Sequence, residues 1–191
     1  MDKPSIKDLF QISSLPAAVI GGGSSAPSDY AKLPPNCLII SANHHAYMLG
    51  LRPDYFVFND DPQTRPFIME RLKNPQGATV ISSRYQQYSD YRIDVPNFNR
   101  GFTGQFCAWL GCWITSGAVY LCGFDLYSSD QHYFHGVNNE GERGAEYSVD
   151  HHLERWELAL GKNPKEKGCY MPERINAVSG LLTNIFKHEH N

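Results

Sequence analysis

Five short apolar runs are spaced along the first two thirds of the chain. They are rich in β-branched and aromatic residues and do not alternate with polar residues: AAVIG (17–21), CLIIS (37–41), YFVFN (55–59), ATVIS (78–82) and AVYLCGF (118–124). Strands that are covered on both faces have this pattern, and such strands are typical of parallel sheets. The runs therefore predict a mainly parallel sheet.

Longer segments predict helices. Residues 101–117 carry apolar side chains at helical spacing with few polar positions, which is typical of a helix buried on all sides. A second helix is predicted over 148–161, with Ser148 or Asp150 as its N-cap, and a third over about 172–187. Strands and helices in this order predict an α/β fold.

The segment from about 126 to 150 is polar, contains glycine and shows no periodicity. It is too long for an ordinary connection, so we interpret it as a lid-like insertion. A chain of 191 residues is long enough for one domain with a substantial core. We therefore expect a single Rossmann-like three-layer α/β domain over 1–191, with a small lid loop.

Charge and apolar content indicate which partners and which cellular location the sequence favours. The formal net charge is −3 without any block of like charges, so the sequence does not predict a nucleic-acid partner. No apolar run approaches the roughly 18 residues that span a bilayer, and residues 1–10 lack a hydrophobic signal core. We expect a soluble cytoplasmic protein, and the sequence leaves open whether it forms a homo-oligomer.

Four cysteines lie within apolar stretches, where a thiol behaves as a small hydrophobic group. They are Cys37, Cys107, Cys112 and Cys122. The spacing of Cys107 and Cys112 is not that of a zinc ribbon. We therefore expect reduced core residues.

The first predicted strand runs directly into Gly21-Gly22-Gly23-Ser24-Ser25. Glycine lets backbone N–H groups approach an anion closely, as in the phosphate-binding loops of nucleotide-binding folds. Pro27, Pro34 and Pro35 leave little room for the crossover helix of a dinucleotide site, and no lysine follows as in a P-loop. The segment is either a loop that holds a mononucleotide phosphate or a bare turn.

Polar and small residues also follow the other predicted strands. Asn43 follows the second strand, Asn59 ends the third, and Asp125 follows the last. Thr103 and Gly104 begin the buried helix. Because ligands of open parallel sheets bind beyond the carboxyl ends of the strands, we expect these residues to form one ligand-binding rim.

Four segments resemble, in order and spacing, the bacterial sialyltransferase-like proteins of the Campylobacter CMP-sialic acid transferase type: VIGGGSS (19–25), ISANHHAY (40–47), YFVFND (55–60) and FNRGFTGQFCAWLGCWITSGAVYLCGFDLYS (98–128). The same frame occurs in the DUF115 superfamily, which includes archaeal hydroxymethyl-dihydropterin pyrophosphokinases. The resemblance covers about residues 17–128. It implies a glycosyltransferase that moves a sugar from a CMP-sugar donor to a hydroxyl of a glycan or small-molecule acceptor, without a cofactor.

The resemblance also implies roles for individual residues. It implies that the nucleotide is contacted by Gly22, Gly23, Ser24, Asn43, Asn59, Thr103, Gly104 and Asp125. Lid tyrosines that bind the departing phosphate correspond to Tyr127 and Tyr133. The catalytic base corresponds to His151 or His152, and imidazole suits removal of a proton because it titrates near neutrality. Position 22 is glycine where the family commonly has asparagine.

Two other functions stay open. Asp60, Asp61 and Asp125 offer the oxygen ligands that Mg²⁺ prefers, which would suit a Mg²⁺-dependent pyrophosphokinase. Asp60 and Asp61 equally suit the start of a turn before Pro62. The chain could also bind a nucleotide as a sensor without catalysing a reaction.

Histidines give a further alternative. His132, His135, His151 and His152 could assemble a cation site, but their spacing is not diagnostic and we predict no metal. His44 and His45 follow a strand, where we expect them to cap a helix or line a pocket.

Overall fold

The computed structural model describes residues 12–93, 102–128, 133–136, 148–159 and 172–186. Seven strands of this part of the chain form one sheet, in which every neighbouring pair is parallel. They are β1 (Ala17–Ile20), β2 (Leu38–Ala42), β3 (Tyr55–Val57), β4 (Thr79–Ser82), β5 (Tyr91–Arg92), β6 (Val119–Cys122) and β7 (Ile175–Ala177). The predicted α/β class and parallel sheet are confirmed.

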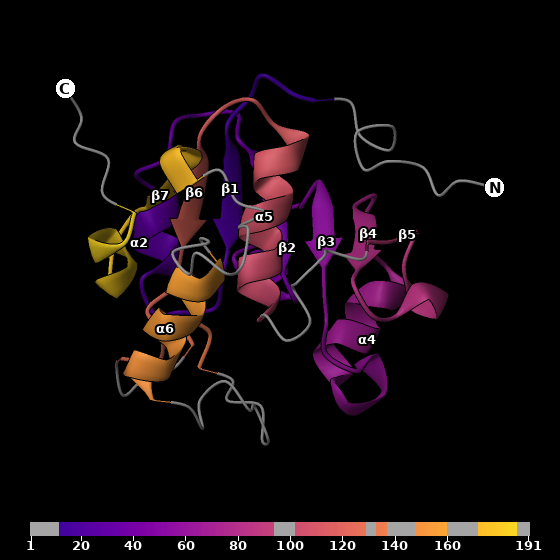
Figure 1. The fold of residues 1–191 in the computed structure, drawn as a ribbon. Coiled ribbons are helices and arrows are strands. Elements are labelled where there is room, and N and C mark those ends of the chain that lie inside the picture. The colour runs from indigo at the N-terminus through magenta and orange to yellow at the C-terminus, as the bar shows by residue number, and fades with distance from the viewer. Residues whose placement is uncertain (1–11, 94–101, 129–132, 137–147, 160–171, 187–191) are drawn as a thin grey trace.

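The strand order is β5-β4-β3-β2-β1-β6-β7 (Figure 1). The chain adds β2 to β5 on one side of β1, and then returns through α5 (Thr103–Ile114) to place β6 on the other side. The order therefore reverses between β1 and β6. In Rossmann-like folds this switch point is where ligands bind.

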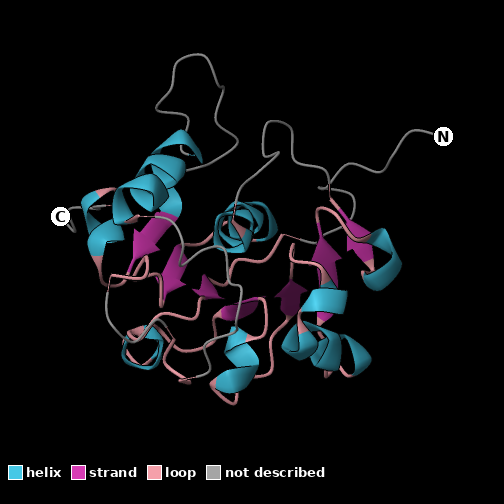
Figure 2. Ribbon diagram, turned by 90° about the horizontal axis from the view of Figure 1, so that it is seen from below, coloured by secondary structure: helices cyan, strands magenta, loops and turns pink. Residues whose placement is uncertain are grey.

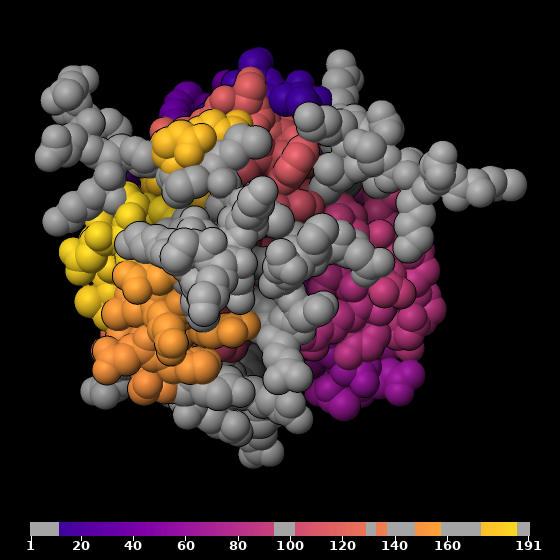
Figure 3. Space-filling model, in the orientation of Figure 1, coloured from indigo at the N-terminus to yellow at the C-terminus, as the bar shows by residue number. Residues whose placement is uncertain are grey.

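Helices cover both faces of the sheet (Figure 2). One face carries α5 and α6 (Val149–Ala159), and the other carries α2 (Ala26–Tyr30), α3 (His45–Met48) and α4 (Pro66–Lys73). Short 3-10 helices are η1 (Pro62–Thr64), η2 (Gln86–Tyr88), η3 (Pro172–Arg174) and η4 (Leu181–Asn184). In the view of Figure 3, α6 and the C-terminal segment lie on one side, and α4 and β4 on the other.

The two covered faces explain why the strands are apolar throughout. Ala17 and Val19 of β1 belong to the core cluster that contains α5, whereas Ala18 and Ile20 pack against Ala46 of α3. Successive side chains of a strand point to opposite faces, so both sets must be apolar. The buried helix predicted near 101–117 is confirmed as α5, which packs on β1, β2 and β6.

The helix predicted over 172–187 is wrong. The segment forms η3, β7 and η4, and β7 pairs with β6 through Val119 opposite Ile175 and Leu121 opposite Ala177. Without this pairing, β6 would present unpaired backbone groups at the edge of the sheet. The pairing with β6 is a contact between distant segments, and the local sequence on which the helix prediction rested does not reveal it.

The prolines after the glycines allow a short crossover helix. Pro27 occupies the first turn of α2, where a missing N–H costs no intrahelical hydrogen bond. Cys107, Cys112 and Cys122 are buried free thiols as predicted, and Cys37 is half-buried. No helix among the described residues is long and apolar enough to cross a membrane.

Candidate functional site

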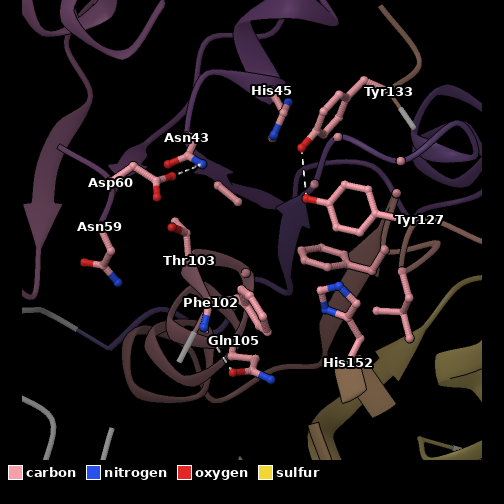
Figure 4. A pocket seen from close by; sticks show the side chains of 18 of the residues that line it. Asn43, His45, Asn59, Asp60, Phe102, Thr103, Gln105, Tyr127, Tyr133 and His152 are labelled. Carbon is pink, nitrogen blue, oxygen red and sulfur yellow. Dashed lines mark hydrogen bonds between the residues drawn. The ribbon is translucent and has the colours of Figure 1, made fainter. Parts of the chain in front are cut away.

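A cavity of about 820 Å³ lies at the carboxyl ends of β1, β2, β3 and β6, at the switch point of the sheet (Figure 4). This volume is typical of small-molecule sites. Ten of the twelve residues for which the sequence predicts a binding or catalytic role line it: Gly22, Gly23, Asn43, Asn59, Thr103, Gly104, Asp125, Tyr127, Tyr133 and His152. Ser24 and His151 are not among the lining residues.

The glycine loop packs tightly against the loop after β6. The Gly21 N–H donates to the Cys122 carbonyl and the Gly23 N–H to the Gly123 carbonyl, both at 2.8 Å. A Cβ at Gly23 would lie 2.7 Å from Asp125 Oδ2, so a side chain has no room there. Glycine is therefore required at this position by the close approach of two loops.

Gly22 lies beneath two aromatic rings. A Cβ on it would lie 2.5 Å from His45 Cε1 and 2.7 Å from Tyr133 Cε1. Its carbonyl accepts a hydrogen bond of 3.0 Å from the Phe134 N–H, which joins the described part of the predicted lid to the glycine loop. The asparagine common at this position in the resembling family would collide with these rings.

The carboxylates of Asp125 and Asp29 hold the glycine loop (21–25) in place through hydrogen bonds. Asp125 Oδ2 accepts hydrogen bonds from the Ser25 N–H (2.9 Å) and the Ser24 hydroxyl (3.0 Å). Ser25 Oγ also lies 2.7 Å from Oδ2 of Asp29, which is 1 % exposed and accepts from the Gly123 N–H. Ser24 is exposed, and its hydroxyl supports the loop through Asp125, which itself lines the cavity.

Asn43 and Asn59 follow β2 and β3 and lie on one side of the cavity (Figure 4). Asn43 adopts a left-handed backbone (φ 55°), which asparagine tolerates better than most residues, and its amide donates to Asp60 Oδ2 at 3.2 Å. Its buried Oδ1 has no hydrogen-bond partner among the described residues. Asn59 Oδ1 accepts from the Ser83 N–H and hydroxyl.

The N-terminus of α5 faces the same cavity, with Thr103 and Gly104 in its lining. Gln105 Oε1 accepts a hydrogen bond of 3.3 Å from the Phe102 N–H and so fixes the start of the helix. A Cβ at Gly104 would collide with the Phe124 ring. The first N–H groups of a helix and its dipole favour an anion, so this end of α5 suits a phosphate group.

His152, Tyr127 and Tyr133 form the opposite wall (Figure 4). His152 is 3 % exposed, and its ring lies 4.8 Å from the Phe102 ring and 5.3 Å from the Tyr127 ring, measured between centroids. The Tyr127 and Tyr133 hydroxyl oxygens lie 2.9 Å apart. A buried imidazole and a pair of phenol hydroxyls therefore face the two asparagines across the cavity.

The start of α6 separates the two candidate histidines. Ser148 Oγ accepts a hydrogen bond of 3.2 Å from the His151 N–H, which confirms Ser148 as the N-cap. One helical position further, His152 turns into the cavity and is buried, whereas His151 is half-buried outside the lining.

His44, His45 and His135 gather at one edge of the cavity, which His45 lines. Burial, reinforced by the charges of His135 and Arg71, lowers the pKa of His44 to about 4. Burial also holds the pKa of His45 well below its usual value and lowers the pKa of His135. All three imidazoles are therefore neutral at pH 7.

Several lining residues were not predicted. Arg65 and Arg84 add positive charge to a cavity that also contains Asp60 and Asp61. Arg84 follows β4, and the rule that ligands lie beyond strand ends could have found it. Arg65 precedes α4 and belongs to no recognisable motif. Of the four histidines considered as an alternative cation site, His135 lies with His44 and His45, and His132 lies outside the described residues.

Two solved structures are similar in fold to this protein. The sialyltransferase CstII from Campylobacter jejuni in complex with the substrate analogue cytidine-5'-monophosphate is similar, with a TM-score of 0.56 and 14 % identity over 95 % of this chain and 90 % of that chain. A second structure, CST-II with a trisaccharide acceptor and CMP, gives a TM-score of 0.54 and 16 % identity over 88 % and 84 %. No protein-family model and no curated protein matches the sequence. The chain therefore shares the Rossmann-like α/β fold of these sialyltransferases.

Proposed function

We propose that this protein is a glycosyltransferase that uses a CMP-sugar as donor and a hydroxyl group of a glycan or small molecule as acceptor. The observation that carries the proposal is the cavity at the β1–β6 switch point, where ten predicted residues converge in a sialyltransferase-like fold. Its two walls offer the groups that such a reaction needs, namely polar contacts for a nucleotide and a base for the acceptor.

The donor nucleotide would lie across the carboxyl ends of β1 to β3. The unsatisfied acceptor Asn43 Oδ1 suits an amino group such as that of cytosine, because a buried acceptor gains most from a new donor. The N-terminus of α5 and the side chains of Arg65 and Arg84 supply positive potential for the phosphate. We therefore propose no metal ion as the partner of the phosphate.

His152 is the proposed general base. It would take the proton from the acceptor hydroxyl while that oxygen forms a bond to the anomeric carbon of the sugar. The bond from the anomeric carbon to the phosphate oxygen breaks, and CMP leaves with the electron pair. One of the two hydroxyls of Tyr127 and Tyr133 donates to the other, so the second hydroxyl keeps its proton and can donate a hydrogen bond to the leaving phosphate.

The pyrophosphokinase alternative has less support. Asp61 Oδ1 accepts from the Gln63 N–H and begins η1, as expected of a turn residue before proline. Asp60 pairs with Asn43, and Asp125 is engaged by Ser25. These contacts favour structural roles for the three carboxylates.

The test is transfer from CMP-sialic acid to a panel of hydroxyl acceptors, measured as CMP release without added metal. We expect turnover in the wild type, loss of turnover with retained CMP binding in His152→Ala, and activity within a few-fold of wild type in His151→Ala. Reaction only with ATP and Mg²⁺ would support the pyrophosphokinase instead. CMP binding without any turnover would indicate a sensor.

A further inference from the structure

The histidine cluster beside the cavity has the dimensions of a metal site. His45 Nδ1 and His135 Nε2 lie 3.3 Å apart. Zinc–nitrogen bonds of about 2.0–2.1 Å at a tetrahedral angle place two ligand nitrogens roughly 3.3 Å apart. A ring nitrogen of His44 completes a set in which all ligand atoms lie within 4.8 Å of one another. A small shift of the His44 ring would bring three nitrogens to the separations of a tetrahedral centre.

The His44 ring supplies an independent indication of a ligand. It is 3 % exposed, and neither its Nδ1 nor its Nε2 has a hydrogen-bond partner among the described residues. Buried polar groups of native proteins nearly always have partners, and an ion is one explanation for an exception. A metal ion would satisfy one nitrogen of His44 and explain why a histidine is buried here.

Aromatic neighbours hold the three rings in place. The His44 ring stacks on Phe67 at 5.1 Å between centroids, and the His45 ring stacks on Tyr133 at 5.3 Å. The His135 ring is within 3° of parallel to Tyr133. Such packing restricts the orientations of the three rings before an ion binds, so only the His44 ring has to shift and the entropy cost of binding is lowered.

We propose that His44, His45 and His135 bind one divalent transition-metal ion, with Zn²⁺ as the first choice. Neutral imidazoles suit zinc, copper and nickel, whereas Mg²⁺ and Ca²⁺ require oxygen ligands. Three protein ligands leave a fourth position for water or a substrate oxygen. The ion would join the start of α3 to the segment that carries Tyr133, and so fix one wall of the cavity.

The test is a titration of chelator-treated full-length protein with Zn²⁺ by calorimetry and with Co²⁺ by visible absorption. We expect one ion per chain, a tetrahedral Co²⁺ spectrum and no saturable binding of Mg²⁺. His135→Ala and His44→Ala should each weaken binding by about tenfold or more, the size of effect that losses around a metal site produce. His135 is half-buried, so its variant tests the site even if His44→Ala unfolds.

The matched control is the double variant His188→Ala/His190→Ala, which removes two histidines that lie outside the described residues. It should bind Zn²⁺ like the wild type. Absence of binding, unchanged affinity in His135→Ala, or loss of binding in the control would overturn the proposal. Because the readout is metal binding, its failure is distinct from failure of the proposed sugar transfer.

Discussion

Gly22→Ala tests how the glycine loop shapes the cavity wall. The Gly22 backbone does not have a positive φ, so alanine adopts its conformation and the cost comes from contacts alone. The new Cβ would lie 2.5 Å from His45 Cε1 and 2.7 Å from Tyr133 Cε1, whereas carbon atoms normally pack about 3.5–4.0 Å apart. Both rings must therefore move by roughly 1 Å.

Overpacking of this kind costs about 1–3 kcal/mol, and the lower entropy of the unfolded alanine chain offsets about 0.4–1 kcal/mol of it. We expect a net loss of about 1–2 kcal/mol, which for a chain of this length lowers Tm by roughly 2–8 °C. Thermal and urea unfolding followed by circular dichroism measure this loss. CMP binding should weaken in parallel, because Tyr133 lines the cavity.

A double-mutant cycle with Tyr133→Ala separates the clash from other effects. Removal of the ring should lower the cost of Gly22→Ala, with a coupling free energy of about 1 kcal/mol. Gly50→Ala is the control, since a Cβ there meets nothing within 4 Å and its cost, from a φ of 75°, should not depend on Tyr133. An equal cost of Gly22→Ala in both backgrounds would refute the packing argument.

Three further predictions concern the reaction and the loop. His152→Ala should lower kcat by about 10²–10⁴-fold, the usual contribution of a general base, and a loss below tenfold in initial rates would argue against that role. Tyr127→Phe and Tyr133→Phe should each lower kcat by roughly tenfold or less, as expected for one hydrogen bond, while unchanged rates in both would exclude the hydroxyls from the reaction. Ser25→Ala should lower the free energy of unfolding by about 1–3 kcal/mol in urea titrations, because it removes the hydroxyl whose single proton is shared between the carboxylates of Asp29 and Asp125; unchanged stability would show that this hydroxyl is dispensable.

The sequence predicts the centre of the sheet and most of the cavity for one physical reason. Strands covered on both faces must be apolar throughout, so β1 to β4 and β6 are visible as uninterrupted runs. In a parallel sheet the carboxyl ends of the strands lie at one edge, which brings Asn43 and Asn59 together, and a crossover helix such as α5 begins at that same edge, which adds Thr103.

Features that depend on distant partners could not be predicted. β7 has only three residues and pairs with β6, which lies more than 50 positions earlier in the sequence, so no local pattern reveals this strand. His45 and His135 are 90 positions apart in the sequence, and their contact follows from the return of the segment around Tyr133 to the glycine loop. The glycines are a third case: the pattern suggested a phosphate contact, which stays a prediction, and the structure shows that Gly22 and Gly23 are also tightly packed against neighbouring side chains and backbone.

Calorimetric titration with CMP in the absence of divalent metal tests the nucleotide site most directly, using two glycine substitutions at asparagines with left-handed backbones. Asn43→Gly removes the cavity amide without backbone strain, and Asn36→Gly makes the same change at an exposed position with a φ of 64°. We expect one saturable CMP site per chain, with affinity weakened about tenfold in Asn43→Gly and unchanged in Asn36→Gly. Absence of saturable CMP binding, or equal affinity in wild type and Asn43→Gly, would contradict the proposed nucleotide site.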